Sequence, residues 1–377
     1  MSLSRLLRAA AFAALAGVSF AAAAKTAVPL KVLIVVSGEG RDQGKSRPGF
    51  EMDEFAQAWS IFVDNGFAID VASPRGGAVE ADKFDPAEPF NARVVADAGA
   101  MRLLAETRAT AKVDANDYAV VYVVGGKGAM FDLPADPALK RLIGAVYDRG
   151  GVVAAVCHGP AALVDVRLAD GSLLVAGRHL TGFSNEEEAI FGKRWAKEFR
   201  FLLEDAMRER GARWQEAPLM MPKLVVDGRL ITGQNPYSTP AVAAAIVRAA
   251  GRTPVARAPW RDEKSMALVE RLLAGEADAV RRALAEHRAD YHVELIGLLG
   301  YYQLQSATTN DAVRDALAIM QLAEPHMPQP QLAVGIADAH LRLGDAVRAR
   351  ALLEAVLATQ PELPEAKALL ARINAQP

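Results

Sequence analysis

Between residues 31 and 251, short apolar runs alternate with segments of helical length. The apolar runs are KVLIVVS (31–37), AIDVAS (68–73), YAVVYVV (118–124) and VVAAV (152–156). Such near-continuous runs are typical of parallel strands covered on both faces. Helices are expected over 50–65, 136–148 and 239–251, and a hairpin over 224–233. This order predicts an α/β domain over 28–251 with a doubly wound, flavodoxin-like and mostly parallel sheet.

The pattern changes after residue 251. Residues 252–264 contain two prolines and several charges, which indicates a linker, and residues 265–377 predict only helices. Residues 330–363 fit one tetratricopeptide (TPR) unit, with a turn at Gly344, Ala349 at the small packing position and Pro361 at the end. Upstream matches are looser, so a plain helical bundle without a binding role is the alternative to a TPR-like domain. We expect the α/β domain to fold without this tail.

The first 24 residues predict a secretory signal peptide. Arg5 and Arg8 form a short positive segment, residues 9–24 are uncharged and rich in alanine, and Ala22 and Ala24 offer a cleavage site. An exported protein, periplasmic or secreted, is therefore expected. An uncleaved membrane anchor is the alternative, although sixteen weakly apolar residues are few for a bilayer.

Composition excludes several classes of function. The chain has 43 Lys and Arg against 45 Asp and Glu, a net charge of −2, and this balance does not indicate binding to nucleic acid. The sequence also has no basic block that would indicate binding to a membrane surface. One cysteine cannot form a disulfide within its own chain. Six scattered histidines show no zinc-ligand spacing, so neither a metal nor another cofactor is expected.

The single cysteine, Cys157, lies where an apolar strand meets a helix expected to begin at Pro160. Only His158 and Gly159 separate the two elements, so the turn must be tight. Such a turn lifts its central side chain to the edge of the sheet, as in nucleophile elbows. The amides of the following helix would lower the pKa of the thiol. Cys157 is therefore a candidate nucleophile, and a buried structural cysteine is the alternative.

Four motifs carry a family resemblance: AVCHGPAAL, GGKGAMFDLP, TGFSNEEEAIFG and DGRLITGQNP. In this order and spacing they resemble the DJ-1/PfpI superfamily, which is class I glutamine amidotransferase-like. The most similar branch is the heat-shock-protein-like one that includes glutathione-independent glyoxalases (glyoxalase III). The resemblance covers residues 31–251 and does not extend to the helical tail.

The resemblance implies a catalytic group around Cys157. Cys157 would be the nucleophile, which attacks a carbonyl as thiolate. His158 would act as acid and base, oriented by an acid from a later loop that fixes the imidazole tautomer. By register this acid is Glu188, with Glu186 and Glu187 as competing choices.

Further residues are implied beside the sulfur. Glu54 would lie there partly buried, with a raised pKa and a hydrogen bond to donate, and Asp53 is the alternative. Gly125 and Gly126 permit close backbone approach and would form an oxyanion hole with the amide that follows Cys157.

Lys127 departs from the branch, which usually has a histidine between these glycines. With His158 it is a candidate for substrate binding, because its compact cation can hold an anionic intermediate. A lysine does not exchange its proton near neutrality as a histidine does. The substitution therefore bears on activity and leaves the expected fold unchanged.

These features predict an exported, cysteine-dependent enzyme that acts on small reactive aldehydes, for example converting methylglyoxal to lactate. It would need neither glutathione nor a metal, and hydrolysis of glycated adducts (a deglycase activity) is a variant of the same chemistry. A homodimer is expected from the resemblance. The alternative is a non-enzymatic holdase or scaffold that binds peptides or proteins through the TPR-like tail.

Overall fold

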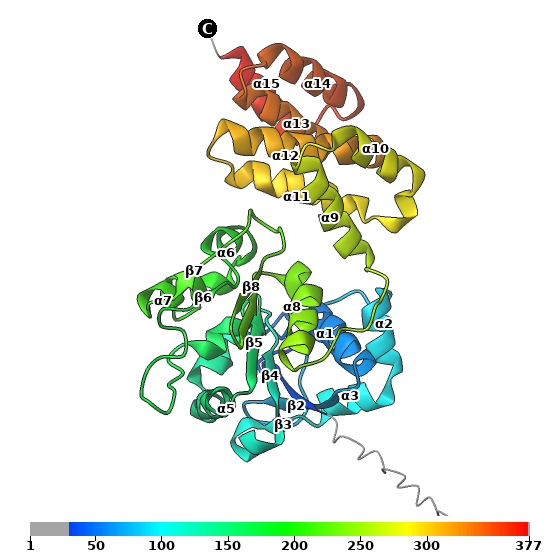
Figure 1. Cartoon of the computed structure of the whole chain (residues 1–377). Helices are drawn as coiled ribbons and strands as arrows, with labels where there is room; N and C mark the ends of the chain where they lie inside the picture. The colour runs from blue at the N-terminus through cyan, green and yellow to red at the C-terminus, as the bar shows by residue number, and fades with distance from the viewer. Residues whose placement is uncertain (1–29, 376–377) are drawn as a thin grey trace, which may run out of the picture.

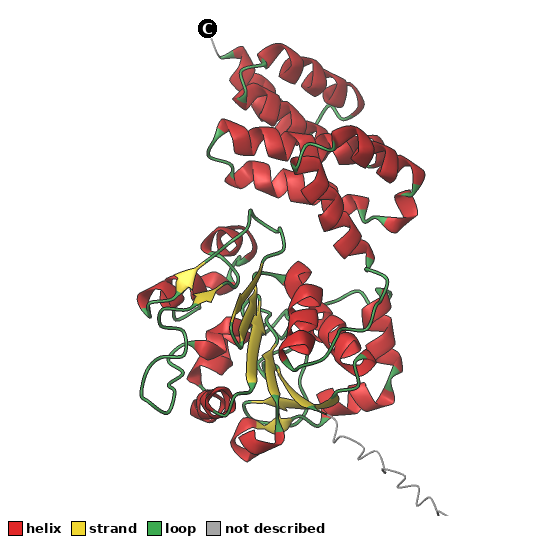
Figure 2. Ribbon diagram, in the orientation of Figure 1, coloured by secondary structure: helices red, strands yellow, loops and turns green. Residues whose placement is uncertain are grey.

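The computed structural model describes residues 30–375, and its α/β domain is built on one seven-stranded sheet. The strand order is β3-β2-β1-β4-β5-β9-β8, and every neighbouring pair is parallel except β8 with β9. The strands are β1 (Lys31–Val35), β2 (Ala68–Ser73), β3 (Arg108–Ala109), β4 (Val120–Val123), β5 (Val152–Val156), β8 (Leu224–Asp227) and β9 (Leu230–Gly233). The prediction of a doubly wound, mostly parallel sheet is confirmed (Figure 2).

Helices cover both faces of this sheet. The helices α1 (Met52–Asp64) and α8 (Thr239–Ala249) pack together on one face, and α5 (Pro137–Asp148) lies on the other (Figure 1). All residues of β4 and β5 are buried, as expected for central strands. The side chain of Asp136 accepts hydrogen bonds from the amides of Ala138 and Leu139, so it fixes the start of α5.

Several elements of this domain lie in segments for which the sequence predicts none. They are the helices α2 (Pro89–Ala96), α3 (Ala98–Ala105), α4 (Ala129–Asp132), α6 (Asn185–Phe191) and α7 (Leu203–Glu209), and a small sheet of β6 (His179–Leu180) and β7 (Arg213–Trp214). These elements are short, so each offers too few residues for a clear hydrophobic period.

The structure differs from the expected elements at two places. The segment after Cys157 forms only a five-residue 3₁₀ helix, Gly159–Leu163, where the sequence predicts the first turns of an α-helix. The helical domain begins at Arg261, inside the predicted linker, because Glu263 accepts from the amide of Trp260 and pairs with Arg257. The connecting segment is also attached to the α/β domain, since the rings of Trp260 and Phe90 stack edge to face at 5.3 Å.

The C-terminal domain is entirely helical over its described residues. It contains α9 (Arg261–Leu273), α10 (Ala277–Glu286), α11 (Val293–Ser306), α12 (Asn310–Ala323), α13 (Pro330–Arg342), α14 (Ala346–Thr359) and α15 (Pro364–Asn374). Gly344 turns the chain between α13 and α14 with φ of +90°, and Ala349 is fully buried between these helices. The all-α domain is thus confirmed, whereas its membership of the TPR class stays a prediction.

The two domains share one hydrophobic cluster. Leu219, Met220 and Met221, which precede β8, are buried together with apolar side chains of α9, α11 and α12. The helical domain therefore covers part of the α/β domain near α6 and β8, as Figure 1 shows. This contact argues against the expectation that the α/β domain is self-sufficient, because its removal would expose three large apolar side chains.

The signal peptide predicted for residues 1–24 lies outside the described residues and stays a prediction. Among residues 30–375, none of the helices has the length and apolar character needed to cross a bilayer.

We predict that a chain ending at Trp260 unfolds at a lower temperature than the α/β domain of the whole protein. Burying a Leu or Met side chain contributes about 1.5–3 kcal/mol, and three such side chains lose their cover. A chain ending at Leu363 is the matched control, because α15 packs in a separate cluster with α13 and α14. Calorimetry of the three chains tests this; equal unfolding temperatures for the α/β domain would contradict it.

Candidate active site

The predicted nucleophile lies at the carboxyl edge of the sheet, where β5 ends next to β4 and β4 ends next to β1. Ligands of doubly wound sheets bind at this edge, where the strand order reverses. Cys157 follows β5 directly and has a left-handed backbone with φ of +59°. Its amide donates to Gly233 O at 2.9 Å and its carbonyl accepts from the amide of Phe183 at 2.8 Å, so both neighbours hold this strained turn.

Two glycines make room for the turn. A Cβ at Gly125 would lie 2.7 Å from the Cβ of Cys157, and one at Gly159 would lie 2.5 Å from Val123 O. Real side chains cannot approach so closely, so both positions require glycine. The geometry agrees with the nucleophile elbow that the sequence predicts.

His158 connects the sulfur to an acid. Its Nδ1 lies 3.4 Å from Cys157 Sγ and its Nε2 lies 2.8 Å from Glu188 Oε2. Both side chains are buried, and the imidazole packs against the ring of Phe183 with 4.3 Å between centroids. Of the three consecutive glutamates, Glu188 is the one that contacts His158, as the register predicts.

Glu54 is fully buried beside the elbow. Its Oε2 accepts a hydrogen bond from the amide of Gly125 at 2.6 Å. Burial raises the pKa of this carboxyl well above its usual range, and the charge of Glu51 adds to the effect. This shift favours the protonated carboxyl, which can donate a hydrogen bond toward the sulfur. The alternative, Asp53, accepts instead from the side chain of Asn91 at 2.6 Å.

The expected lowering of the thiol pKa is not found. Burial raises the pKa of Cys157, and an ionised Glu54 raises it further, while a hydrogen bond from the Gly126 amide acts in the opposite direction. The 3₁₀ helix after Cys157 is too short to supply the dipole of a full α-helix. Burial thus disfavours ionisation of both Cys157 and Glu54, and the charge of either group would disfavour ionisation of the other.

The predicted oxyanion hole needs one correction. The amide of Gly125 already donates to Glu54, so it does not face a substrate. The amide of Gly126 is directed at the sulfur and is the better placed donor. Gly126 needs its glycine, because its φ is +87° and a Cβ would lie 2.6 Å from the amide nitrogen of Glu51.

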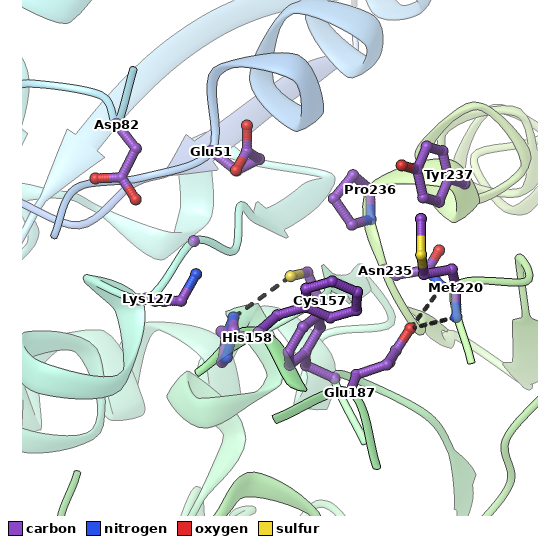
Figure 3. A pocket seen from close by; sticks show the side chains of 13 residues that line it. Glu51, Asp82, Lys127, Cys157, His158, Glu187, Met220, Asn235, Pro236 and Tyr237 are labelled. Carbon is purple, nitrogen blue, oxygen red and sulfur yellow. Dashed lines mark hydrogen bonds between the residues drawn. The ribbon is translucent and has the colours of Figure 1, made fainter. Parts of the chain in front are cut away.

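A cavity of about 190 Å³ opens in front of Cys157 (Figure 3). Figure 3 shows Lys127, Glu51 and Asp82 on one side and Met220, Pro236 and Tyr237 on the other, where Glu187 and Asn235 also lie. The rings of Phe183 and Phe191 add to the apolar lining. Lys127 thus lies in the site as predicted, together with acids that the sequence does not single out.

Glu51 is a partly buried acid of this cavity, and burial raises its pKa to about 8, with further contributions from the charges of Asp53 and Asp82. Burial likewise raises the pKa of Glu187 to about 7, although this carboxylate accepts from Asn235 at 2.9 Å. The sequence holds signals for two of these residues: Glu51 lies one helical turn before Glu54, and Asn235 is part of the GQNP motif.

Residues 46–249 match the model of the DJ-1/PfpI family. The chain belongs to this family. The chain is 30% identical over 241 residues to the glutathione-independent glyoxalase hsp3101 of Schizosaccharomyces pombe, covering 58% of this chain and 95% of the relative. It is 31% identical over 215 residues to the glutathione-independent glyoxalase HSP31 of Saccharomyces cerevisiae, covering 51% and 85%.

Solved structures of DJ-1/PfpI type agree with this assignment. Glyoxalase III from Candida albicans superposes with a TM-score of 0.53 at 28% identity, over 58% of this chain and 97% of that one. The rapid encystment protein of Francisella tularensis gives a TM-score of 0.54 at 28% identity, over 59% and 99%. The comparisons confirm the predicted family, the predicted fold and the prediction of an enzyme.

We predict that Glu54→Gln leaves the alkylation rate of Cys157 within about threefold of the wild type, since the amide can accept from Gly125 and donate to sulfur as a protonated carboxyl does. Glu54→Ala leaves the buried amide of Gly125 unpaired, which costs about 1–3 kcal/mol, and should lower stability. Iodoacetamide labelling followed by mass spectrometry is unambiguous, because the chain has one cysteine. A collapse of stability in Glu54→Gln equal to that in Glu54→Ala would contradict a protonated Glu54.

We also predict that Glu51→Gln weakens the pH dependence of stability. With a folded pKa of about 8 against an ordinary 4.5, Glu51 binds more proton in the folded than in the unfolded chain between these values. The free energy of unfolding therefore falls as pH rises through this range, and Gln removes that contribution. Urea unfolding at a series of pH values measures it. The control is Glu354→Gln, an exposed glutamate of α14, and identical pH profiles for all three proteins would contradict the prediction.

Proposed function

We propose that the protein is a glutathione-independent glyoxalase that converts small α-oxoaldehydes, such as methylglyoxal, to 2-hydroxy acids. The observation that carries the proposal is the contact from Cys157 Sγ to His158 Nδ1, and from His158 Nε2 to Glu188, at the wall of a small cavity. The likeness to proteins named glutathione-independent glyoxalase and glyoxalase III supports it.

The chemistry begins with addition of the Cys157 sulfur to the aldehyde carbon, which gives a hemithioacetal. His158 Nδ1 lies 3.4 Å from the sulfur and so reaches groups on the carbon that becomes bound to it. Removal of the hydrogen of that carbon as a proton gives an ene-diol, and return of a proton to the neighbouring carbon gives a thioester of the hydroxy acid. Water then hydrolyses the thioester, releases lactate and restores the thiol. The net reaction consumes one water and no external oxidant or reductant.

The surrounding groups suit these proton transfers. Glu188 holds the imidazole and stabilises its charged form. Protonated Glu54 and the amide of Gly126 face the sulfur, so they can stabilise negative charge there and on the adjoining oxygen. Lys127 offers a cation to the ene-diolate, and protonated Glu51 stands beside it in the cavity as a second proton donor.

Two features favour a small-molecule enzyme over a holdase. The cavity of about 190 Å³ admits a molecule of the size of methylglyoxal and no folded protein. A binding module would not need a strained, buried cysteine whose histidine is held by a buried glutamate. Binding of a partner by the helical domain remains compatible with this activity.

We predict that the purified protein releases lactate from methylglyoxal without glutathione and that Cys157→Ser abolishes this release. Lys127→His should raise turnover, since a positioned acid–base group contributes roughly 10²–10⁴-fold and His restores the group usual in this branch. Lys127→Gln is the control, because it removes the charge without adding a proton carrier. Enzymatic measurement of lactate distinguishes the four proteins.

The following results would contradict the proposed activity. No lactate from either the wild type or Lys127→His, with both proteins folded, would overturn the proposed activity. Capture of a protein partner by the same inactive preparations would then favour the holdase alternative.

A further inference from the structure

The cavity wall opposite Cys157 is formed by the α/β domain and is backed by the helical domain. Met220 lines the cavity and is also buried in the hydrophobic cluster of the helical domain, with 8% of its surface exposed. Figure 3 shows it beside Asn235 and Tyr237, across the opening from the charged wall. Its backbone is left-handed, with φ of +64°, which is unfavourable for a residue that has a Cβ and must be imposed by its surroundings.

Three hydrogen bonds that involve side chains hold the segment 219–221 in this conformation. The amide of Met220 donates to Glu187 Oε1 at 3.3 Å, and the side chain of Asn235 donates to Met221 O at 2.9 Å. The third comes from the helical domain: Gln303 of α11 donates through Nε2 to Leu219 O at 2.9 Å. Gln303 is buried, so neither its amide nor this carbonyl can exchange the bond for one to bulk water.

A second contact links α11 to the catalytic histidine through aromatic rings. Tyr302 packs edge to face on Phe191 with 5.0 Å between centroids. The ring centroids of Phe191 and Phe183 lie 6.5 Å apart, and those of Phe183 and His158 lie 4.3 Å apart. Phe191 is also the last residue of α6, the helix that carries Glu188. Side chains of α11 therefore contact Phe191, which lines the cavity, and Leu219, the residue that precedes Met220.

We propose that α11 of the helical domain supports the wall of the substrate site from behind, and that Gln303 and Tyr302 are positioning residues that set the size of aldehyde reaching Cys157. Met220 and Phe191 narrow the cavity from the side that α11 supports. The site then suits α-oxoaldehydes with a methyl or similarly small substituent and excludes those with an aromatic ring. This substrate class rests on the proposed glyoxalase function, whereas the shape of the wall does not.

The shape is tested in the full-length protein by the reactivity of its one cysteine. Iodoacetamide is the small probe and N-phenylmaleimide the bulky one. Gln303→Leu leaves Leu219 O without its donor, and Tyr302→Ala removes the ring behind Phe191. A buried carbonyl left unpaired costs about 1–3 kcal/mol, equivalent to about 5- to 150-fold in an equilibrium. We expect the ratio of bulky to small labelling rates to rise at least about fivefold in both variants.

Matched variants separate positioning from general damage. Gln305→Leu makes the same change two residues along α11 at an exposed site, and Tyr302→Phe keeps the ring on Phe191. Both should label as the wild type does. Gln303→Asn, which shortens the donor by one methylene, takes the place of Gln303→Leu if the latter does not fold. Labelling ratios unchanged in folded Gln303→Leu, or Gln303→Asn, and Tyr302→Ala would overturn the proposal.

The turnover of methylglyoxal and of phenylglyoxal tests the proposed substrate class. Gln303→Leu should raise kcat/KM for phenylglyoxal relative to methylglyoxal by at least about fivefold, on the same free-energy grounds. If the wild type turns over neither aldehyde while the labelling ratios shift as expected, the proposed function fails and the role of α11 in shaping the site stands. If turnover is present but neither selectivity nor labelling shifts, the function stands and the role of α11 fails.

Discussion

The arrangement of the site depends on one crowded contact, the packing of Cys157 against Gly125 and the buried carboxyl of Glu54. Cys157 holds a left-handed backbone, which costs about 1–3 kcal/mol at a residue with a side chain. Backbone hydrogen bonds to Gly233 and Phe183 hold Cys157 in place. Gly125 has no side chain, which leaves space for the Cβ of Cys157. Moving this turn would separate the sulfur from His158, from Glu54 and from the cavity together.

Burial around this contact favours the protonated forms of the acidic side chains over their charged forms. The pKa values of Glu54, Glu51 and Cys157 are all raised, each chiefly by burial. An isomerisation of an α-oxoaldehyde moves protons between neighbouring carbons and oxygens without net redox change. A site that keeps neutral acids next to one buried imidazole is suited to such transfers, and Lys127 supplies the cation for the anionic stage.

The sequence predicts those parts of the molecule whose cause is local. Unbroken apolar runs and their spacing predict the central strands, and the short gap between a strand and Pro160 predicts the tight turn at Cys157. The 3₁₀ helix after the turn is not predicted, because its residues suit either helix type. Met220 carries no local signal at all. It reaches the cavity only because Glu187, Asn235 and the helical domain fix the loop that holds it.

The packing between the two domains has such a long-range cause and affects the site. An α/β sheet of this type presents its reactive groups on loops at one edge, and loops are the least stable part of a fold. Here the loop at 219–221 and the end of α6 are packed against α9 and α11 rather than left in solvent. The stability of the helical domain and the geometry of the cavity are therefore coupled. A core substitution in α11 can change the reactivity of Cys157 without touching any residue that meets the substrate.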